Sequence, residues 1–207
     1  MEGLAALERV LAVVGGLASL AALLVTVIQY VRWRAWRRKL TWDDVLRVAE
    51  QVLDQIEQGT WKPDVVIGLG RSGGIWGGWL AGNLGSLPLA VVDISYDPSP
   101  SGMNVTFPGG ADVLTSIRRS RGEHLKVLVV EGATSRGQTP QEFFRSFATE
   151  LDGWDTRLGV LYKNPASTAV VDFVGSHDLE PWPQRFPWHA RAVYRPHLRD
   201  LITPGKA

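Results

Sequence analysis

Five short apolar segments alternate with helix-like segments over residues 41–177, and this alternation is the feature that most constrains the fold. The strand-like segments are "DVVIGL" (64–69), "LAVVDISY" (89–96), "LKVLVV" (125–130), "RLGVLY" (157–162) and "TAVVDFV" (168–174). Apolar runs of this kind are typical of parallel strands that are buried on both faces. We therefore predict an α/β domain with a mostly parallel sheet and helices on both faces. Ligands of such sheets bind outside the carboxyl ends of the strands.

The segments between the strands carry helix signals. Thr41 and Asp44 have the spacing of a capping box, and apolar residues then recur at helical spacing until Gly59. Further helices are expected over about 75–84 and 140–151, and a proline- and glycine-rich loop or flexible hairpin over 97–111.

An uncharged apolar run lies near the N-terminus, from Val10 to Ile28. A helix of that length covers about 28 Å, close to the ~30 Å hydrocarbon core of a bilayer. A cleaved signal peptide fits less well, because Glu2 and Glu8 precede the run and no clear small-x-small site follows it. A buried core helix is the other alternative, but a soluble helix of this length normally has a polar face. We therefore predict a transmembrane anchor within residues 1–31.

Basic and aromatic residues follow the apolar run, and they define a juxtamembrane linker over residues 32–40. They are Tyr30, Arg32, Trp33, Arg34, Trp36, Arg37, Arg38 and Lys39. Basic residues stay on the cytoplasmic side and aromatic rings settle at the interface. We therefore expect a single-pass protein with its N-terminus outside and its soluble domain in the cytoplasm. Contact with anionic lipid is enough to explain this basic cluster. The soluble part divides into a core over 41–177 and a Trp- and Pro-rich tail over 178–207.

Composition excludes several classes of site. The net charge of +1 gives no overall field toward nucleic acid, so we expect no nucleic-acid partner. The absence of cysteine rules out disulfides, thiolate catalysis and Cys-ligated zinc. The four histidines show no metal-ligand spacing.

The turn after the first strand, "VVIGLGRSGG", holds the pattern G-x-G-x-x-G at Gly68, Gly70 and Gly73. This pattern, with Asp93 about 20 residues further on, is typical of a dinucleotide-binding turn. An NAD-dependent oxidoreductase is therefore one hypothesis. It offers no substrate-binding domain and leaves a second turn unexplained.

That second turn is "VLVVEGATSRGQTP", residues 127–140, in which small polar residues join a strand to a helix. Free backbone N–H groups at the start of a helix favour an anion, and Arg136 adds positive charge. A monophosphate is the natural ligand. The alternative is an ordinary strand-to-helix connection with a solvated arginine.

Taken together, these segments resemble the type I phosphoribosyltransferases, most closely the bacterial xanthine–guanine and hypoxanthine branch. The resemblance covers about residues 41–190. It is carried by the order and spacing of "TWDD", "WKPDVVIGLGRSGGIWGGWLAGNLG", "ISYD", "VLVVEGATSRGQT", "LYKNPAS", "VVDFVG" and "EPWPQRFPWH". It implies a ligand with phosphate at both ends of a ribose, such as phosphoribosyl diphosphate, or a nucleotide. A homodimer is a further expectation.

The resemblance also implies a role for individual residues. The diphosphate would bind at Arg71, Ser72 and Gly73, and the 5′-phosphate at Ser135, Arg136, Gly137, Gln138 and Thr139. Lys163 would reach an exocyclic oxygen of the purine, and Trp182, or else Trp188, would stack on the base. Residues 97–124 resemble a mobile flap over the reaction centre. For Lys163 and the two tryptophans, a solvated loop position or simple packing is an equally open interpretation.

The acidic part of the motif departs from the family. Active members have two adjacent acids after the third strand and another acid three residues later, which together hold the ribose, support Mg²⁺ and transfer a proton. Here these positions hold Glu131, Gly132 and Ser135. Glu131 is thus the candidate metal ligand, and Glu131 and Ser135 are the candidate catalytic residues. A serine cannot act unaided as the general base that speeds such a reaction.

Two functions are compatible with a site that keeps the anion-binding turns and has lost two of the three acids. A membrane-tethered phosphoribosyltransferase would transfer a phosphoribosyl group to a purine-like base with Mg²⁺. A catalytically eroded module would bind the same compounds and act as a sensor or signalling protein. The loss of two acids favours ligand binding over turnover.

Overall fold

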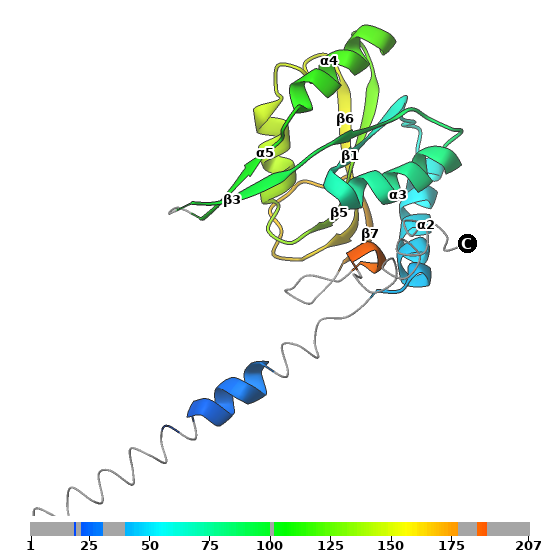
Figure 1. Ribbon diagram of the computed structural model, residues 1–207. Helices are drawn as coiled ribbons and strands as arrows, with labels where there is room; N and C mark the ends of the chain where they lie inside the picture. The colour runs from blue at the N-terminus through cyan, green and yellow to red at the C-terminus, as the bar shows by residue number, and fades with distance from the viewer. Residues whose placement is uncertain (1–18, 20–21, 31–39, 100–101, 178–185, 190–207) are drawn as a thin grey trace, which may run out of the picture. The chain divides into compact units, whose positions relative to one another are not determined.

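The computed structural model of the chain describes residue 19 and residues 22–30, 40–99, 102–177 and 186–189. The chain divides into two compact units, Met1–Lys39 and Leu40–Ala207. In the first unit, residues 22–30 are helical, and Figure 1 draws them in blue. Most of the predicted span over 10–28 lies outside the described residues. Within the described ranges, no helix is both long and apolar enough to cross a membrane.

The second unit is built on a five-stranded sheet in the order β2-β1-β5-β6-β7 (Figure 1). The strands are β1 (Val65–Leu69), β2 (Leu89–Val92), β5 (Lys126–Thr134), β6 (Asp155–Lys163) and β7 (Phe173–His177). All four pairings in this sheet are parallel. The predicted parallel α/β sheet is therefore confirmed, and the carboxyl ends of its strands share one edge.

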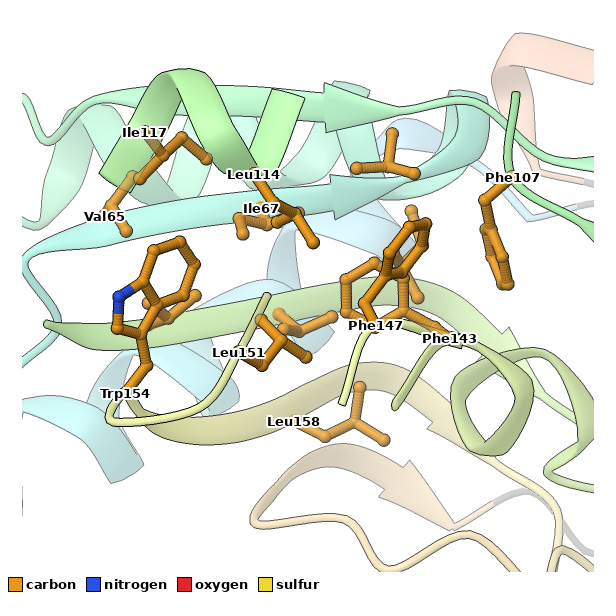
Figure 2. Close-up of a cluster of buried hydrophobic side chains, with 14 of the residues drawn as sticks. Val65, Ile67, Phe107, Leu114, Ile117, Phe143, Phe147, Leu151, Trp154 and Leu158 are labelled. Atoms are coloured by element: carbon orange, nitrogen blue, oxygen red, sulfur yellow. The ribbon is translucent and has the colours of Figure 1, made fainter. Parts of the chain in front are cut away.

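Helices cover both faces of the sheet, as predicted. They are α2 (Trp42–Gln58), α3 (Gly70–Asn83), α4 (Gly110–Arg121) and α5 (Gln138–Ser146). Alternate residues of each central strand enter different cores: Val65 and Ile67 pack with α4 and α5, whereas Val66 packs with α2 and α3. Figure 2 shows the first core, where Leu114 of α4 and Phe143 of α5 lie over the sheet. Burial on both faces explains why these strands read as continuous apolar runs.

The first helix begins and ends where the sequence indicates. Thr41 accepts a hydrogen bond from the Asp44 amide, and Asp44 accepts one from the Thr41 amide, so the capping box is formed. Gly59 follows the last turn. This reciprocal cap satisfies backbone N–H groups that would otherwise lack a partner within the helix.

Several predicted element boundaries differ from the structure. The segment 89–96 contains the whole of β2 and the start of another strand, because Asp93 caps the Ile94 amide after β2 and the chain then enters β3 (Ser95–Ser99). The last strand begins at Phe173, since Thr168 is bonded instead to the loop before α5. That helix also ends earlier than predicted, at Ser146.

The predicted flap over 97–124 is only partly correct. Residues 95–106 form an antiparallel hairpin of β3 and β4 (Gly102–Thr106), but the following residues form α4, which packs into the first core. Its basic end has a structural partner: Arg118 donates to the carbonyls of Glu150 and Asp152 and lies over the ring of Trp154. Arg118 therefore holds the connection before β6 and does not belong to a flap.

Candidate ligand site at the carboxyl edge of the sheet

The glycine turn is the first turn of a helix, with no separate loop. Helix α3 begins at Gly70 directly after β1, five residues earlier than expected, and Gly70 adopts a positive φ of 58°. A Cβ on Gly68 would lie 2.6 Å from the backbone of Gly73, and a Cβ on Gly73 would lie 2.3 Å from the Val130 carbonyl oxygen. Gly68 and Gly73 therefore allow the helix to touch the sheet, which is a packing requirement independent of any ligand.

The same geometry leaves amides free for a ligand. Within the described residues no side chain caps the start of α3, so the N–H groups of the predicted diphosphate residues Arg71, Ser72 and Gly73 lie in a first turn that lacks intrahelical partners at the carboxyl edge. The Arg71 side chain is exposed beside them. A helix start of this kind favours an anion.

The second turn lies beside the first at the same edge, because β1 and β5 are neighbours in the sheet. Strand β5 ends at Thr134, and the loop at Ser135 and Arg136 leads into α5 through Gly137, whose φ is 86°. Both side chains of the loop are exposed. The predicted arrangement of strand, short polar loop and uncapped helix start is therefore present.

A distant connection fixes the shape of this second turn. The amide and hydroxyl of Thr168 both donate to the Arg136 carbonyl, at 3.2 and 2.9 Å. A Cβ on Gly137 would lie 2.5 Å from the Ala169 nitrogen. Gln138 is turned away from the loop, since its side-chain amide donates to the Met103 carbonyl of β4 at 2.7 Å. The turn is thus held by contacts from the 168–169 connection and from β4, while the side chains of Ser135 and Arg136 stay exposed.

One buried acid lies between the two turns. Glu131 is 8% exposed, and its Oε2 has no hydrogen-bond partner in the part of the chain that the structure describes. Burial raises the pKa of Glu131 to about 8, and a hydrogen bond from Thr139 offsets part of this rise. At neutral pH the carboxyl is therefore mostly uncharged.

Glu131 ends a chain of hydroxyl groups that the sequence did not reveal. The Thr139 hydroxyl bonds to Glu131, and the Tyr96 hydroxyl of β3 lies 3.1 Å from the same Thr139 oxygen. A threonine hydroxyl has one proton, so Tyr96 donates to Thr139 when Thr139 donates to Glu131. Burial raises the pKa of Tyr96, the hydrogen bond with Thr139 offsets part of this rise, and the charge of Glu131 adds to it. This chain ties the β3–β4 hairpin to the acid.

Gly132, where active family members carry a second acid, has no space for a side chain. A Cβ there would lie 2.6 Å from Ser72 Cβ and 3.3 Å from a ring carbon of Phe186. Phe186 stacks on Trp188 at 4.6 Å, and the Trp188 indole donates to Ser72 Oγ at 3.1 Å. The side chains of Ser72 and Phe186 thus occupy the space that a side chain at position 132 would need.

These observations test the predicted magnesium site. Mg²⁺ needs ionised carboxylates or substrate phosphates in octahedral geometry. Glu131 is mostly uncharged and buried, Gly132 cannot be replaced by an acid without moving Ser72, and no group of three acidic or histidine side chains converges among the described residues. The described residues do not fit a resident magnesium ion.

The remaining predicted base-binding residues are placed only in part. Lys163 lies half-buried at the carboxyl end of β6, paired with Thr134 and His177 in the neighbouring strands. Trp182 lies outside the described residues. Trp188 has Phe186 parallel to its ring at an angle of 6°, so one face of the indole is covered. Asp93 of the dinucleotide hypothesis is exposed and bonds to the amide of Ile94.

Comparison with known proteins supports the fold. No family model matches the chain, and no curated protein matches it. Among solved structures, a purine phosphoribosyltransferase from Pyrococcus horikoshii is 24% identical with a TM-score of 0.58, covering 73% of this chain and 93% of that one. A hypothetical protein from Neisseria gonorrhoeae with bound ppGpp is 24% identical with a TM-score of 0.60, covering 78% and 93%. The xanthine–guanine–hypoxanthine phosphoribosyltransferase of Helicobacter pylori is 15% identical with a TM-score of 0.58, covering 79% and 98%. The chain therefore has the fold of the type I phosphoribosyltransferases.

Proposed function

We propose that the second unit binds a phosphoribosyl diphosphate or a purine nucleotide at the carboxyl edge of β1 and β5. The single observation that carries this is the pair of uncapped helix starts, α3 and α5, at the ends of two adjacent parallel strands. Each start carries an exposed arginine, Arg71 in one and Arg136 in the other. Two anion sites on neighbouring strands suit a ligand with phosphate at both ends of its sugar.

Structural neighbours help to choose the ligands for a test. The Neisseria gonorrhoeae protein was solved with ppGpp, and two other neighbours are purine phosphoribosyltransferases. A purine nucleotide, with phosphates reaching both turns, is therefore our preferred ligand class. An NAD-like dinucleotide is less favoured, because Asp93 is engaged with the backbone at the end of β2.

Binding without turnover is the form of this function that the acidic residues favour. In the transfer reaction, the bond from ribose C1 to the pyrophosphate oxygen breaks and its electron pair leaves with pyrophosphate. A bond from the base nitrogen to C1 forms, and the proton on that nitrogen passes to a general base. Glu131 is buried and mostly uncharged, and Ser135 is no base by itself. A sensor or signalling module is therefore our first candidate and a phosphoribosyltransferase our second.

The membrane anchor remains part of the proposal. Residues 22–30 form a helix with large apolar side chains that are exposed, among them Leu23, Leu24 and Val25. A helix with apolar residues all round is typical of burial in a large core or in a membrane. We propose that residues 10–28 cross a membrane with the second unit in the cytoplasm. Retention of the chain in the membrane fraction after a carbonate wash tests this; release into the supernatant would contradict it.

Calorimetric titration of the full chain in detergent tests the ligand. The panel is phosphoribosyl diphosphate, guanosine and adenosine monophosphates, ppGpp and NAD. We expect saturable binding of at least one phosphorylated purine or phosphoribosyl compound, and roughly tenfold or greater loss in Arg71→Ala, which removes a charge-assisted contact. Arg119→Ala is the matched control, because Arg119 is also an exposed arginine and lies on α4. Binding of NAD alone would overturn the proposal. Release of pyrophosphate with a purine base would make the enzyme the first candidate.

A further inference from the structure

The C-terminal aromatic pair contacts the first turn of α3, and this contact suggests a role for Trp188 other than stacking on a base. We propose that Trp188 is a positioning residue, which holds Ser72 and the first turn of α3 in the geometry that binds the diphosphate end of the ligand. The proposal rests on the proposed function of this site. It assigns Trp188 to one end of the ligand only.

The contact itself is direct. The Trp188 indole N–H donates to Ser72 Oγ at 3.1 Å, and Ser72 is the third residue of α3, within the turn whose amides are uncapped. Ser72 is also wedged against the position where Gly132 would carry a Cβ. With an indole on one side and the backbone of β5 on the other, the serine has little freedom to rotate or shift. The amides of Arg71 and Gly73 flank it in the chain.

Trp188 can fix the position of Ser72 because aromatic contacts fix the position of Trp188 itself. Its ring is parallel to Phe186, which is only 5% exposed, and it lies 5.6 Å from the ring of Trp42 at the start of α2. Phe186 in turn contacts Tyr162 of β6. Of this aromatic cluster, Tyr162 and Phe186 belong to the core between the sheet and α2 and α3, Trp188 packs against that core, and Trp42 lies at its exposed edge. Because these rings pack around Trp188, its indole N–H donor has a fixed direction. A side chain that positions a binding site needs such a fixed direction.

The second anion turn is held by a different set of contacts. Thr168 bonds to the Arg136 carbonyl, and Ala169 packs against Gly137. Helix α5 packs on the opposite face of the sheet from α3 and the aromatic cluster. Loss of the Trp188 contact should therefore change the diphosphate end and leave the 5′-phosphate end unchanged.

A titration with partial ligands separates the two ends. The probes are inorganic pyrophosphate and phosphoribosyl diphosphate for the first turn, and ribose 5-phosphate for the second, all with the full chain in detergent. Trp188→Phe keeps an aromatic ring in the cluster and removes the N–H donor. We expect roughly fivefold weaker binding of the two diphosphates, the usual effect of one lost hydrogen bond, and unchanged binding of ribose 5-phosphate.

Ser72→Ala removes the acceptor without touching the aromatic cluster, so it covers the case in which Trp188→Phe disturbs the fold. It should weaken diphosphate binding to the same extent, and the double variant should add no further loss. Trp154→Phe is the matched control, because Trp154 lies in the other core and its indole N–H has no described partner. Its ligand affinities should equal those of the wild type.

The outcomes distinguish this inference from the proposed function. Full diphosphate affinity in Trp188→Phe and Ser72→Ala, with the wild type binding normally, overturns the positioning role alone. Weaker binding of nucleoside monophosphates with unchanged binding of pyrophosphate makes Trp188 a base-stacking residue and also overturns it. Failure of the wild type to bind any probe removes the proposed function and this inference with it.

Discussion

The two helix starts at the carboxyl edge of the sheet are similar in position but differ in construction. In α3 the strand passes straight into the helix, and Gly68 and Gly73 pack against backbone atoms. In α5 a short exposed loop precedes the helix, and its shape depends on Thr168 and Ala169, more than thirty residues further along the chain. The first turn is therefore part of the sheet's own packing, whereas the second is set by an external connection. Glycine substitutions at the first turn should cost mainly stability, and those at the second should cost both stability and ligand affinity.

The largest effect is expected from Gly73→Ala. The new Cβ would lie 2.3 Å from the Val130 carbonyl oxygen, a backbone atom that cannot move without distorting β5. We expect the free energy of unfolding to fall by about 3 kcal/mol or more, at the upper end of overpacking effects. Urea denaturation of the full chain in detergent measures this.

Gly82→Ala is the control for that substitution. Gly82 lies in the same helix, but a Cβ there would meet no atom within 4 Å. Because alanine is the better helix former, this variant should gain roughly 0.5–1 kcal/mol. If Gly73→Ala gained stability as Gly82→Ala does, helix propensity would decide the effect at position 73, and the close contact with the sheet would be refuted.

Gly137→Ala tests the second turn and should have the next largest effect. Gly137 precedes α5 with φ at 86°, and a Cβ there would lie 2.5 Å from the Ala169 nitrogen. We expect a loss of about 2 kcal/mol from left-handed strain and crowding, together with loss of ribose 5-phosphate binding. The readouts are urea denaturation and calorimetric titration.

Gly109→Ala is a close match to that change. Gly109 precedes α4 in the same left-handed conformation, with φ at 69°, but it has open space around its Cβ position. In Gly109→Ala the free energy of unfolding should fall by about 1–2 kcal/mol from left-handed strain, with no contribution from crowding. This variant should keep full ligand affinity. Equal loss of affinity in the two variants would show that the second turn is not the phosphate site.

The sequence was sufficient to predict the parts of the fold that depend on local pattern. The apolar runs at β1, β5 and β6 are strands because both of their faces are buried, and Thr41 and Asp44 cap α2 through neighbouring backbone groups. The boundary of β7 could not be predicted in this way. Thr168 looks like a strand residue, but its hydrogen bonds go to Arg136, a contact that the sequence pattern does not contain.

For the candidate site, too, the sequence predicted the features that depend on local pattern and missed those that depend on contacts between distant residues. The two glycine-containing turns were found from their position after strands, but the reason for Gly73 lies in the carbonyl of Val130 on another strand. Tyr96 and Phe186 were missed, although "ISYD" and "EPWPQRFPWH" contain them. Their roles depend on contacts with Thr139 and Trp188, which only the folded chain brings close.

Glu131, the buried acid of the candidate site, gives the next prediction. Its pKa is raised from 4.5 to about 8, so the folded state holds a proton that the unfolded state releases above about pH 4.5. The contribution of Glu131 to the free energy of unfolding is therefore fully present below pH 4.5, the pKa of the group in the unfolded chain. It is lost as the pH rises toward 8, by at most about 1.4 kcal/mol per pH unit. We expect the wild type to lose roughly 2 kcal/mol between pH 6 and 8, and Glu131→Gln to lose little of this.

Glu142→Gln is the control for the pH series. Glu142 is paired with Arg145, and that pairing lowers its pKa, so its ionisation does not change between pH 6 and 8. This variant should follow the wild-type pH dependence. If Glu131→Gln followed it too, Glu131 would be ionised in the folded protein, and the case against a magnesium ion at this position would be weakened.

The smallest effect is expected at the hairpin, which is tied to the second turn by two contacts. The Tyr96 hydroxyl bonds to Thr139, and the Gln138 side chain donates to the Met103 carbonyl. Because Tyr96 is 50% exposed, water can replace its partner, and Tyr96→Phe should cost only about 0.5 kcal/mol. Amide exchange in β3 and β4 should nevertheless become faster, and faster still in the double variant with Gln138→Ala. Unchanged exchange in the double variant would mean that the strand pairing alone, and not the second turn, holds the hairpin in place.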